Sequence, residues 1–243
     1  MDMHVGQFAH RPTLPDPVKA VIFDMDGTLL DTETVHRRAM GDASRALGWE
    51  LDHEVVLKMV GINREANQLM LAEHLGPDFP MAQFFMDSDV LFEAALEAGI
   101  PMRPGADVIV EHLARAGIPM AIATSTRAPF AQRRLEQAGL LHYFEAVVTR
   151  NDVTQPKPHP EPYLLASRLL GVDPASAVAV EDSYAGIRAA TAAGIATVMV
   201  PDLLPPTDEL VVKTAAVLPS LIHLRDLLMS TPPRQDGDLV IAD

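Results

Sequence analysis

The chain has 243 residues, enough for one large domain or two small ones, and 48% of them are hydrophobic, which suffices for a substantial core. Its 19 Lys and Arg against 33 Asp and Glu give a formal net charge of −14. This charge argues against nucleic acid as a partner, because binding to a phosphate backbone needs a basic footprint. No run approaches the ~20 apolar residues of a membrane span, so no membrane partner is expected. The absence of cysteine excludes disulfides and thiol chemistry.

The two ends of the chain lack the patterns of folded elements. Residues 1–17 are polar, contain proline and include no apolar stretch that could serve as a signal peptide. They predict a flexible N-terminal tail and a cytoplasmic protein, and residues 231–243 predict a C-terminal tail. The oligomeric state is not readable from the sequence, and we expect a monomer or a weak homo-oligomer.

The first strand is predicted at Ala20–Phe23, a continuous apolar run of the kind that is buried inside a parallel sheet. Asp24 and Asp26 follow at its carboxyl end, where open α/β sheets bind ligands. Gly27 allows a sharp turn, so that the Asp24 carboxylate and the Asp26 carbonyl can face one divalent ion. The Asp26 carboxylate then stays available for proton transfer. This segment therefore predicts the chemical centre of the protein.

Helical spacing replaces the strand pattern after residue 33. Apolar residues recur at three- and four-residue intervals from Val35 to Leu47. Asp31 or Thr32 is expected to cap the start of this helix, and Gly48 lies just past its end.

Residues 34–100 contain no strand signal. They are rich in Ala, Leu, Met, Glu and Gln, and Pro77 and Pro80 separate one helical stretch from the next. The pattern predicts a small helical bundle, and residues 100–105 are expected to be the linker that returns the chain to the sheet.

Strands and helices alternate over the rest of the chain, which is typical of a doubly wound parallel sheet. Strands are expected near residues 119–124, 145–149, 177–181 and 196–200, and helices near 105–116, 128–139, 160–171 and 183–193. The predicted fold class is α/β: a Rossmann-like core of residues 18–33 and 101–230 that is interrupted by the α-helical insert 34–100.

Two further segments place polar side chains after apolar strands. Residues 119–127 run from a strand into hydroxyl groups, among them Thr124, whose side chain can donate a hydrogen bond. Residues 178–180 lead into the acidic pair Glu181 and Asp182. Lys157 lies between these segments, in a loop with several prolines. Taken singly, the lysine is typical of a solvated loop and the acidic pair of a helix N-cap.

Together, these segments resemble the four motifs of the haloacid dehalogenase-like superfamily, in order and in spacing, over residues 18–230. The resemblance implies phosphoryl transfer through an aspartyl-phosphate. Asp24 would be the nucleophile, and Asp26 would protonate the leaving group and later activate water. Thr124 and Lys157 would bind the phosphoryl oxygens, together with backbone amides near Ser125.

The resemblance also implies Mg²⁺ as the cofactor. The ion would be held by the Asp24 carboxylate, the Asp26 carbonyl and the Asp182 carboxylate, and Glu181 would orient a metal-bound water from outside the coordination sphere. Hard oxygen ligands without a His or Cys cluster favour Mg²⁺ over zinc.

The helical insert is similar to the cap of the β-phosphoglucomutase-like and small-molecule phosphatase branch. Such a cap closes over a compact substrate and excludes water. Arg64, in the segment 61–64, resembles the cap arginine that contacts substrate, and Glu33 and His36 lie where specificity residues approach the site. Thr126 and Arg127 are further candidates for substrate binding.

These features predict a phosphatase that acts on a small phosphorylated metabolite, such as a sugar phosphate or a nucleoside monophosphate. The main alternative is a β-phosphoglucomutase-like phosphohexomutase. Its pattern includes a cap lysine and a lysine after the second motif, whereas this chain has no lysine between Lys58 and Lys157 and has Arg127 after the second motif. Dehalogenases lack the second aspartate, here Asp26. A non-catalytic binding protein would be expected to have lost one of the motif residues.

Overall fold

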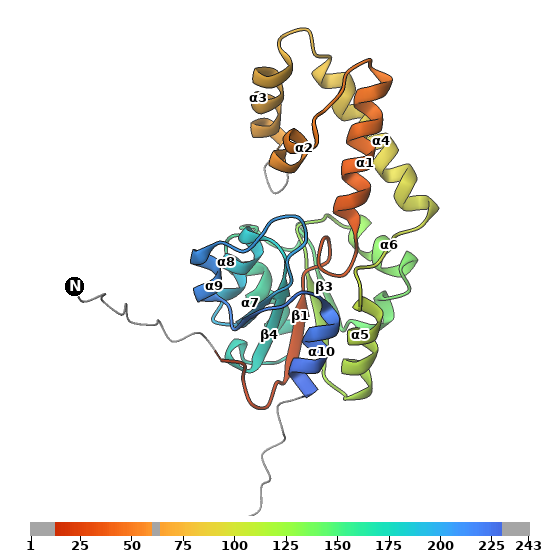
Figure 1. The fold of residues 1–243 in the computed structure, drawn as a ribbon. Helices are drawn as coiled ribbons and strands as arrows, with labels where there is room; N and C mark the ends of the chain where they lie inside the picture. The colour runs from red at the N-terminus through yellow and green to blue at the C-terminus, as the bar shows by residue number, and fades with distance from the viewer. Residues whose placement is uncertain (1–12, 60–63, 230–243) are drawn as a thin grey trace, which may run out of the picture.

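The computed structural model describes residues 13–59 and 64–229 (Figure 1). In chain order, the elements are β1 (Ala20–Phe23), α1 (Thr32–Ala46), α2 (His53–Met59), α3 (Arg64–Leu75), α4 (Met81–Ala98), α5 (Ala106–Arg115), β2 (Met120–Ala123), α6 (Phe130–Gln137), η1 (Leu141–Tyr143), β3 (Ala146–Val148), α7 (Glu161–Leu169), η2 (Pro174–Ser176), β4 (Ala177–Glu181), α8 (Tyr184–Ala192), β5 (Ala196–Met199), α9 (Asp208–Lys213), β6 (Ala216–Val217) and α10 (Leu221–Met229). The predicted tails lie largely outside the described residues.

The six strands form one parallel sheet in the order β3-β2-β1-β4-β5-β6. This is the doubly wound order in which the chain turns back at the first strand, so the predicted Rossmann-like α/β class is confirmed. The topological switch point lies between β1 and β4, because β2 and β3 continue the sheet on one side of β1, and β4, β5 and β6 continue it on the other.

Alternate strand residues build two separate cores, as the two-residue period of a strand requires. On one face, Val21 and Phe23 of β1 pack with apolar residues of α5, α6 and α10. On the other face, Ala20 and Ile22 pack with α7 and α8, including the fully buried Tyr163. Helices therefore cover both faces of the sheet, as Figure 1 shows.

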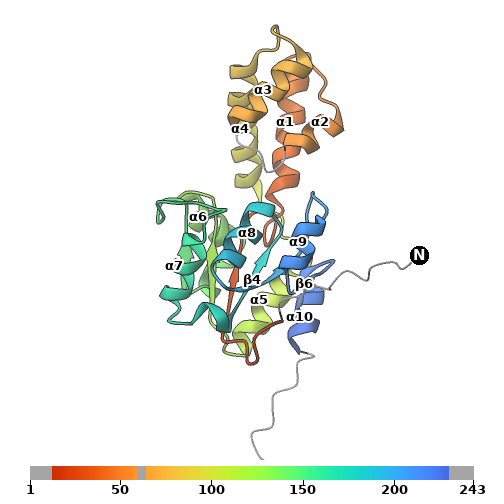
Figure 2. The same cartoon turned by 90° about the vertical axis from the view of Figure 1, so that its left-hand side faces the viewer.

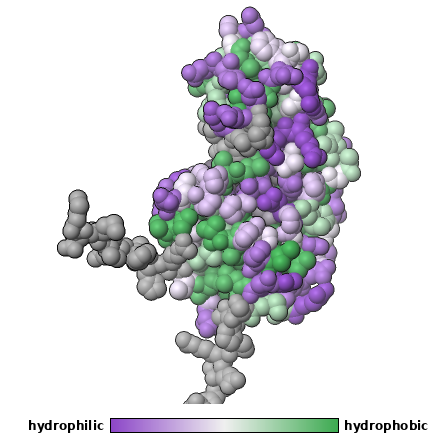
Figure 3. Space-filling view, viewed as in Figure 1, coloured by the Kyte–Doolittle hydropathy of each residue, from purple (hydrophilic) through white to green (hydrophobic). Residues whose placement is uncertain are grey.

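Helices α1 to α4 form a separate lobe above the carboxyl ends of the strands (Figure 2). The lobe has its own apolar cluster, which includes Met40, Leu71, Phe79 and Phe84. In the view of Figure 3, hydrophilic residues predominate over this lobe, whereas hydrophobic residues gather on the sheet-bearing lobe. Helices α1 to α4 are thus the elements that the structure describes in this stretch, and the bounds of the predicted bundle and its role as a cap stay predictions.

The two chain segments that join the lobes lie side by side. Leu30 and Met102 form an antiparallel bridge. On either side of it, the Asp31 amide donates to the Pro101 carbonyl at 2.8 Å, and the Arg103 amide donates to the carbonyl of Leu29 at 2.8 Å. The helical lobe thus begins and ends at one narrow neck.

The expected cap of α1 is wrong. Asp31 occupies the N-cap position without a side-chain capping bond, and Thr32 is already the first residue of the helix. The Thr32 hydroxyl instead donates to Asp26 Oδ1 at 2.9 Å, because the chain brings the start of α1 against the first motif. Gly48 lies just past the helix with a φ of +80°, as expected.

The sequence pattern did not predict α9, β6 or α10. Helix α9 spans six residues and strand β6 only two, so both are too short to show a clear hydrophobic period. None of the helices in the described part of the chain combines the length and apolar character that a membrane span needs.

Candidate active site

The carboxyl ends of β1, β2 and β4 bring the predicted motif residues together. Phe23 of β1 is paired with Ile122 of β2 and with Val180 of β4, so the residues that follow these three positions meet at one edge of the sheet. The Asp24 amide donates to the Val180 carbonyl at 2.9 Å and continues the ladder into the motif. This edge is the switch point at which doubly wound sheets bind ligands.

Lys157 lies between the acidic residues of two motifs. Its Nζ donates to Asp24 Oδ1 at 2.5 Å and to Glu181 Oε1 at 2.6 Å, and its side chain is only 4% exposed. Although burial lowers the pKa of Lys157, the neighbouring carboxylates of Asp24 and Glu181 raise it above its ordinary value. Lys157 is therefore a fixed positive charge rather than a solvated loop lysine.

Glu181 is fully buried, and its two carboxylate oxygens accept hydrogen bonds from four donors. Oε1 accepts from Lys157 and from the Tyr163 hydroxyl at 2.7 Å, and Oε2 accepts from the Ser183 amide at 3.1 Å and hydroxyl at 3.0 Å. The Ser183 hydroxyl also caps α8 through the Gly186 amide at 3.0 Å. These bonds satisfy a charge whose burial would otherwise be costly.

Asp24, Glu181 and Asp182 could hold a metal ion, since one carboxylate oxygen of each lies within 4.8 Å of the others. Burial and the Glu181 carboxylate raise the pKa of Asp24 to about 8 against the opposing effect of Lys157. Burial, Asp24 and Glu181 likewise raise the pKa of Asp182 well above its usual range. Two buried carboxylates and a half-buried one beside the ammonium of Lys157 therefore fit a divalent cation with hard oxygen ligands.

The turn after β1 fits closely against Asp182. The Thr28 hydroxyl donates to Asp182 Oδ1 at 2.8 Å. Gly27 has a φ of +84°, and a Cβ atom there would lie 2.5 Å from Asp182 Oδ2. The glycine is thus required both by the turn and by the approach of the fourth motif.

Asp26 is held by hydroxyl groups and one guanidinium. Oδ1 accepts from Thr32 at 2.9 Å, and Oδ2 accepts from Thr126 at 2.6 Å and from Thr124 at a longer 3.4 Å. Nη1 of Arg134 lies 3.4 Å from Oδ1. The carboxylate therefore has a defined orientation, in contact with the start of α1 and with the second motif.

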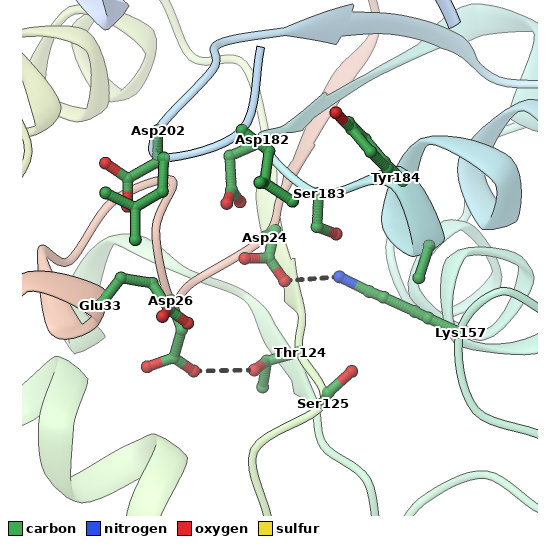
Figure 4. Close-up of a pocket in the computed structure, with 13 residues that line it drawn as sticks. Asp24, Asp26, Glu33, Thr124, Ser125, Lys157, Asp182, Ser183, Tyr184 and Asp202 are labelled. Atoms are coloured by element: carbon green, nitrogen blue, oxygen red, sulfur yellow. Dashed lines mark hydrogen bonds and ion pairs between the residues drawn. The ribbon is translucent and has the colours of Figure 1, made fainter. Parts of the chain in front are cut away.

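A cavity of about 480 Å³ opens over these residues (Figure 4). Its wall contains Asp24, Asp26, Thr124, Ser125, Lys157 and Asp182, all of which the motifs had singled out, and also Glu33. Burial, followed by Asp26 and Asp202, raises the pKa of Glu33 to about 7. The structure thus brings the motif residues to one water-accessible space.

The remaining cap candidates lie away from this cavity wall. The His36 ring packs on Phe92 with centroids 5.0 Å apart, and burial lowers the pKa of His36. Arg64 pairs with Asp89 through both carboxylate oxygens at 2.8 Å, and its guanidinium lies over the Phe85 ring. Residues 61–63 of the same loop lie outside the described residues.

Thr126 and Arg127 have different surroundings. Thr126 is bonded to Asp26, as described above. Arg127 is exposed and is not part of the cavity wall. Their proposed contacts with substrate stay predictions.

Sequence reasoning assigned no role to several residues of the site. Asp202, Leu203 and Leu204 line the cavity from the loop after β5, and Asp202 forms an ion pair with Arg103 at 2.6 Å. Asp202 could have been found by the rule that identified Asp24, since it also follows a buried parallel strand. Arg134 had no such signal, because an arginine on a helix is usually exposed.

The fold and the site define an α/β enzyme whose acidic and basic groups meet at the carboxyl edge of a parallel sheet. The family model described as haloacid dehalogenase-like hydrolase matches residues 18–194. The chain belongs to this family and is a hydrolase, which confirms the resemblance inferred from the motifs.

Named relatives cover most of the chain. It is 35% identical over 177 residues to the fructose-1-phosphate phosphatase YqaB of Escherichia coli, covering 72% of this chain and 92% of that protein. It is 37% identical over 176 residues to hexitol phosphatase A of the same organism, covering 72% and 80%. The crystal structure of a protein described as a putative β-phosphoglucomutase from Thermotoga maritima matches with a TM-score of 0.76 at 28% identity, over 88% of this chain and all of that one (100%).

The close packing of α8 on Glu181 leads to a first prediction. A Cβ atom at Gly186 would lie 1.6 Å from Glu181 Oε1, whereas one at Gly41, also inside a helix, would meet nothing within 4 Å. Gly186→Ala should lower the free energy of unfolding by about 3 kcal/mol or more, because Glu181 must leave its bonds. Gly41→Ala should raise it by about 0.5–1 kcal/mol.

Urea unfolding of both variants and the parent checks this pair of values. A Gly186→Ala protein as stable as the Gly41→Ala control would contradict the packing described.

Proposed function

We propose that this hydrolase is a Mg²⁺-dependent phosphatase that cleaves a small phosphorylated metabolite through an aspartyl-phosphate intermediate. The observation that carries the proposal is the grouping of Asp24, Asp26 and Lys157 at one cavity of about 480 Å³. A two-step phosphoryl transfer requires a nucleophile, a general acid/base and a positive charge that binds the phosphoryl oxygens.

In this mechanism, the Asp24 carboxylate attacks phosphorus and the bond to the leaving oxygen breaks. Asp26 gives that oxygen a proton, so that a neutral alcohol departs. Asp26 then takes a proton from the water that attacks the aspartyl-phosphate, which releases phosphate and restores Asp24. The same carboxyl group thus works as acid and then as base.

Lys157 and Thr124 would neutralise and orient the phosphoryl oxygens. The buried ammonium of Lys157 is already aimed at Asp24. A preorganised charge in a partly dehydrated site stabilises the transition state without reorganising at the moment of reaction.

Asp24, Asp182 and the carbonyl of Asp26 would hold Mg²⁺, which when bound offsets the negative charge of nucleophile and phosphate. Glu181 would act from outside the coordination sphere, a role supported by the four bonds that already occupy its oxygens. The donor set of carboxylates and a carbonyl suits a hard cation.

Sugar phosphates are the substrate class that we propose first, because two relatives are named as fructose-1-phosphate and hexitol phosphatases. (Pseudo)uridine 5′-phosphate is the second compound to test. A panel of phosphorylated metabolites, scored by release of phosphate, tests both. The proposed cap would close over the leaving group, with Glu33, His36 and Arg64 as candidate contacts.

The nucleophile can be tested by Asp24→Asn. The amide is nearly isosteric but is a poor nucleophile and a poor metal ligand, so turnover of 4-nitrophenyl phosphate should fall below detection in a folded protein. The exposed Asp173→Asn variant, at the opposite end of β4, is the matched control and should retain parental activity. Activity of Asp24→Asn within about tenfold of the parent, with deamidation excluded by mass spectrometry, would remove Asp24 from this role.

Metal dependence gives another test. EDTA should stop hydrolysis and lower the melting temperature, and Mg²⁺ should restore both, because Asp24, Glu181 and Asp182 repel one another without a cation. Calcium should restore activity poorly, since its longer and looser coordination misaligns the nucleophile. Full activity in EDTA would contradict the proposed metal role.

The reaction product distinguishes a phosphatase from the alternative, a phosphohexomutase. A mutase must retain a bisphosphate and shield its aspartyl-phosphate from water, and the stretch between Lys58 and Lys157 offers no lysine for a second phosphate. We expect net release of phosphate from sugar monophosphates and little conversion of glucose 1-phosphate to glucose 6-phosphate, even with bisphosphate primer. A coupled assay in which isomerisation outpaces phosphate release would favour the mutase.

A further inference from the structure

Arg134 of α6 is a buried arginine that the proposed chemistry does not use. Its side chain is 10% exposed, Nη1 lies 3.4 Å from Asp26 Oδ1, and Nη2 donates to Glu93 Oε1 at 2.9 Å. Glu93 belongs to α4, the last helix of the helical lobe. One guanidinium thus contacts both the carboxylate of the first motif and the lobe above the site.

The contacts of Arg134 fix its orientation. A guanidinium stays charged and presents its donors in a rigid planar fork, so it cannot follow one carboxylate without disturbing the other. The group also lies over the Phe92 ring at 5.2 Å, next to Glu93 on the same helix. A buried charge with these partners has little freedom to turn toward solvent.

Asp26 is therefore connected to both ends of the helical lobe. Thr32, the first residue of α1, bonds directly to Oδ1. Arg134 connects the same oxygen to α4. A shift of either helix relative to the sheet would change the bonds of Asp26.

We propose that Arg134 is a positioning residue that sets the orientation of the Asp26 carboxyl group for proton delivery, and that Glu93 transmits the position of α4 to it. The inference rests on the proposed function, in which Asp26 is the general acid. It assigns to α6 a part in coupling the lobe to the proton-transfer step.

Arg133, which precedes Arg134 in the sequence, provides a matched control for substitutions of Arg134. Arg133, also on α6, pairs with Glu97 of α4 at 2.7 Å, and its side chain is 51% exposed. This pair links the same two helices but has no contact with Asp26 among the described interactions. Loss of a helix-to-helix ion pair can thus be separated from loss of the contact with Asp26.

The test compares kcat/KM for two esters in the full-length enzyme with Mg²⁺. 4-Nitrophenyl phosphate has a leaving group that departs without protonation, whereas phenethyl phosphate, an alkyl ester, needs the proton from Asp26. Arg134→Gln should lower kcat/KM for the alkyl ester by about tenfold or more relative to the aryl ester, because mispositioning removes part of general acid catalysis. Arg134→Lys and Glu93→Gln should give smaller losses in the same direction, and Arg133→Gln should leave the ratio unchanged.

Equal losses on both esters in Arg134→Gln, or the same change of ratio in Arg133→Gln, would overturn the inference. If Arg134→Gln does not fold, Glu93→Gln decides, and an unchanged ratio in that variant contradicts the proposal. A parent enzyme that hydrolyses neither ester would instead refute the proposed function.

Discussion

The site depends on the crowding of three carboxylates, two of them buried, beside the ammonium of Lys157. The sheet and its helices take Asp24 and Glu181 out of water and partly cover Asp182, and the ammonium of Lys157 contacts both buried carboxylates. Removing charges from water is expensive unless partners replace the solvent. The hydroxyls of Tyr163 and Ser183 and the fit to a cation follow from this requirement.

The same requirement explains why small residues surround the cluster. Gly27 and Gly186 lie where a Cβ atom would overlap Asp182 and Glu181, respectively. The carboxylates are therefore held by backbone that approaches them directly, which leaves their side chains few alternative rotamers. Such rigidity suits a reaction whose nucleophile must be in line with the leaving group.

Much of the fold and of the site follows from local pattern. The alternating strand and helix patterns predicted the core, and polar residues after strands predicted Asp24, Thr124 and Asp182 at one edge, because parallel strands end together. Arg134 and the hydroxyl of Thr32 escaped prediction because their partners are decided by how the helical lobe packs on the sheet. The surroundings of Arg64 and His36 depend in the same way on contacts between helices, which no spacing in the sequence encodes.

The narrow neck between the lobes has a consequence for the entropy of the chain. Leu30 and Met102 form a bridge, so the helical lobe is an insertion whose first and last residues are adjacent. The entropic cost of bringing the two ends of an inserted segment together grows only with the logarithm of its length, by about 0.6 kcal/mol for each doubling. The entropy lost on joining the two ends of the lobe is therefore nearly independent of the length of chain between them. A chain built in this way can change the part that faces a leaving group, in size or in sequence, while the strands that carry the reacting groups keep their register.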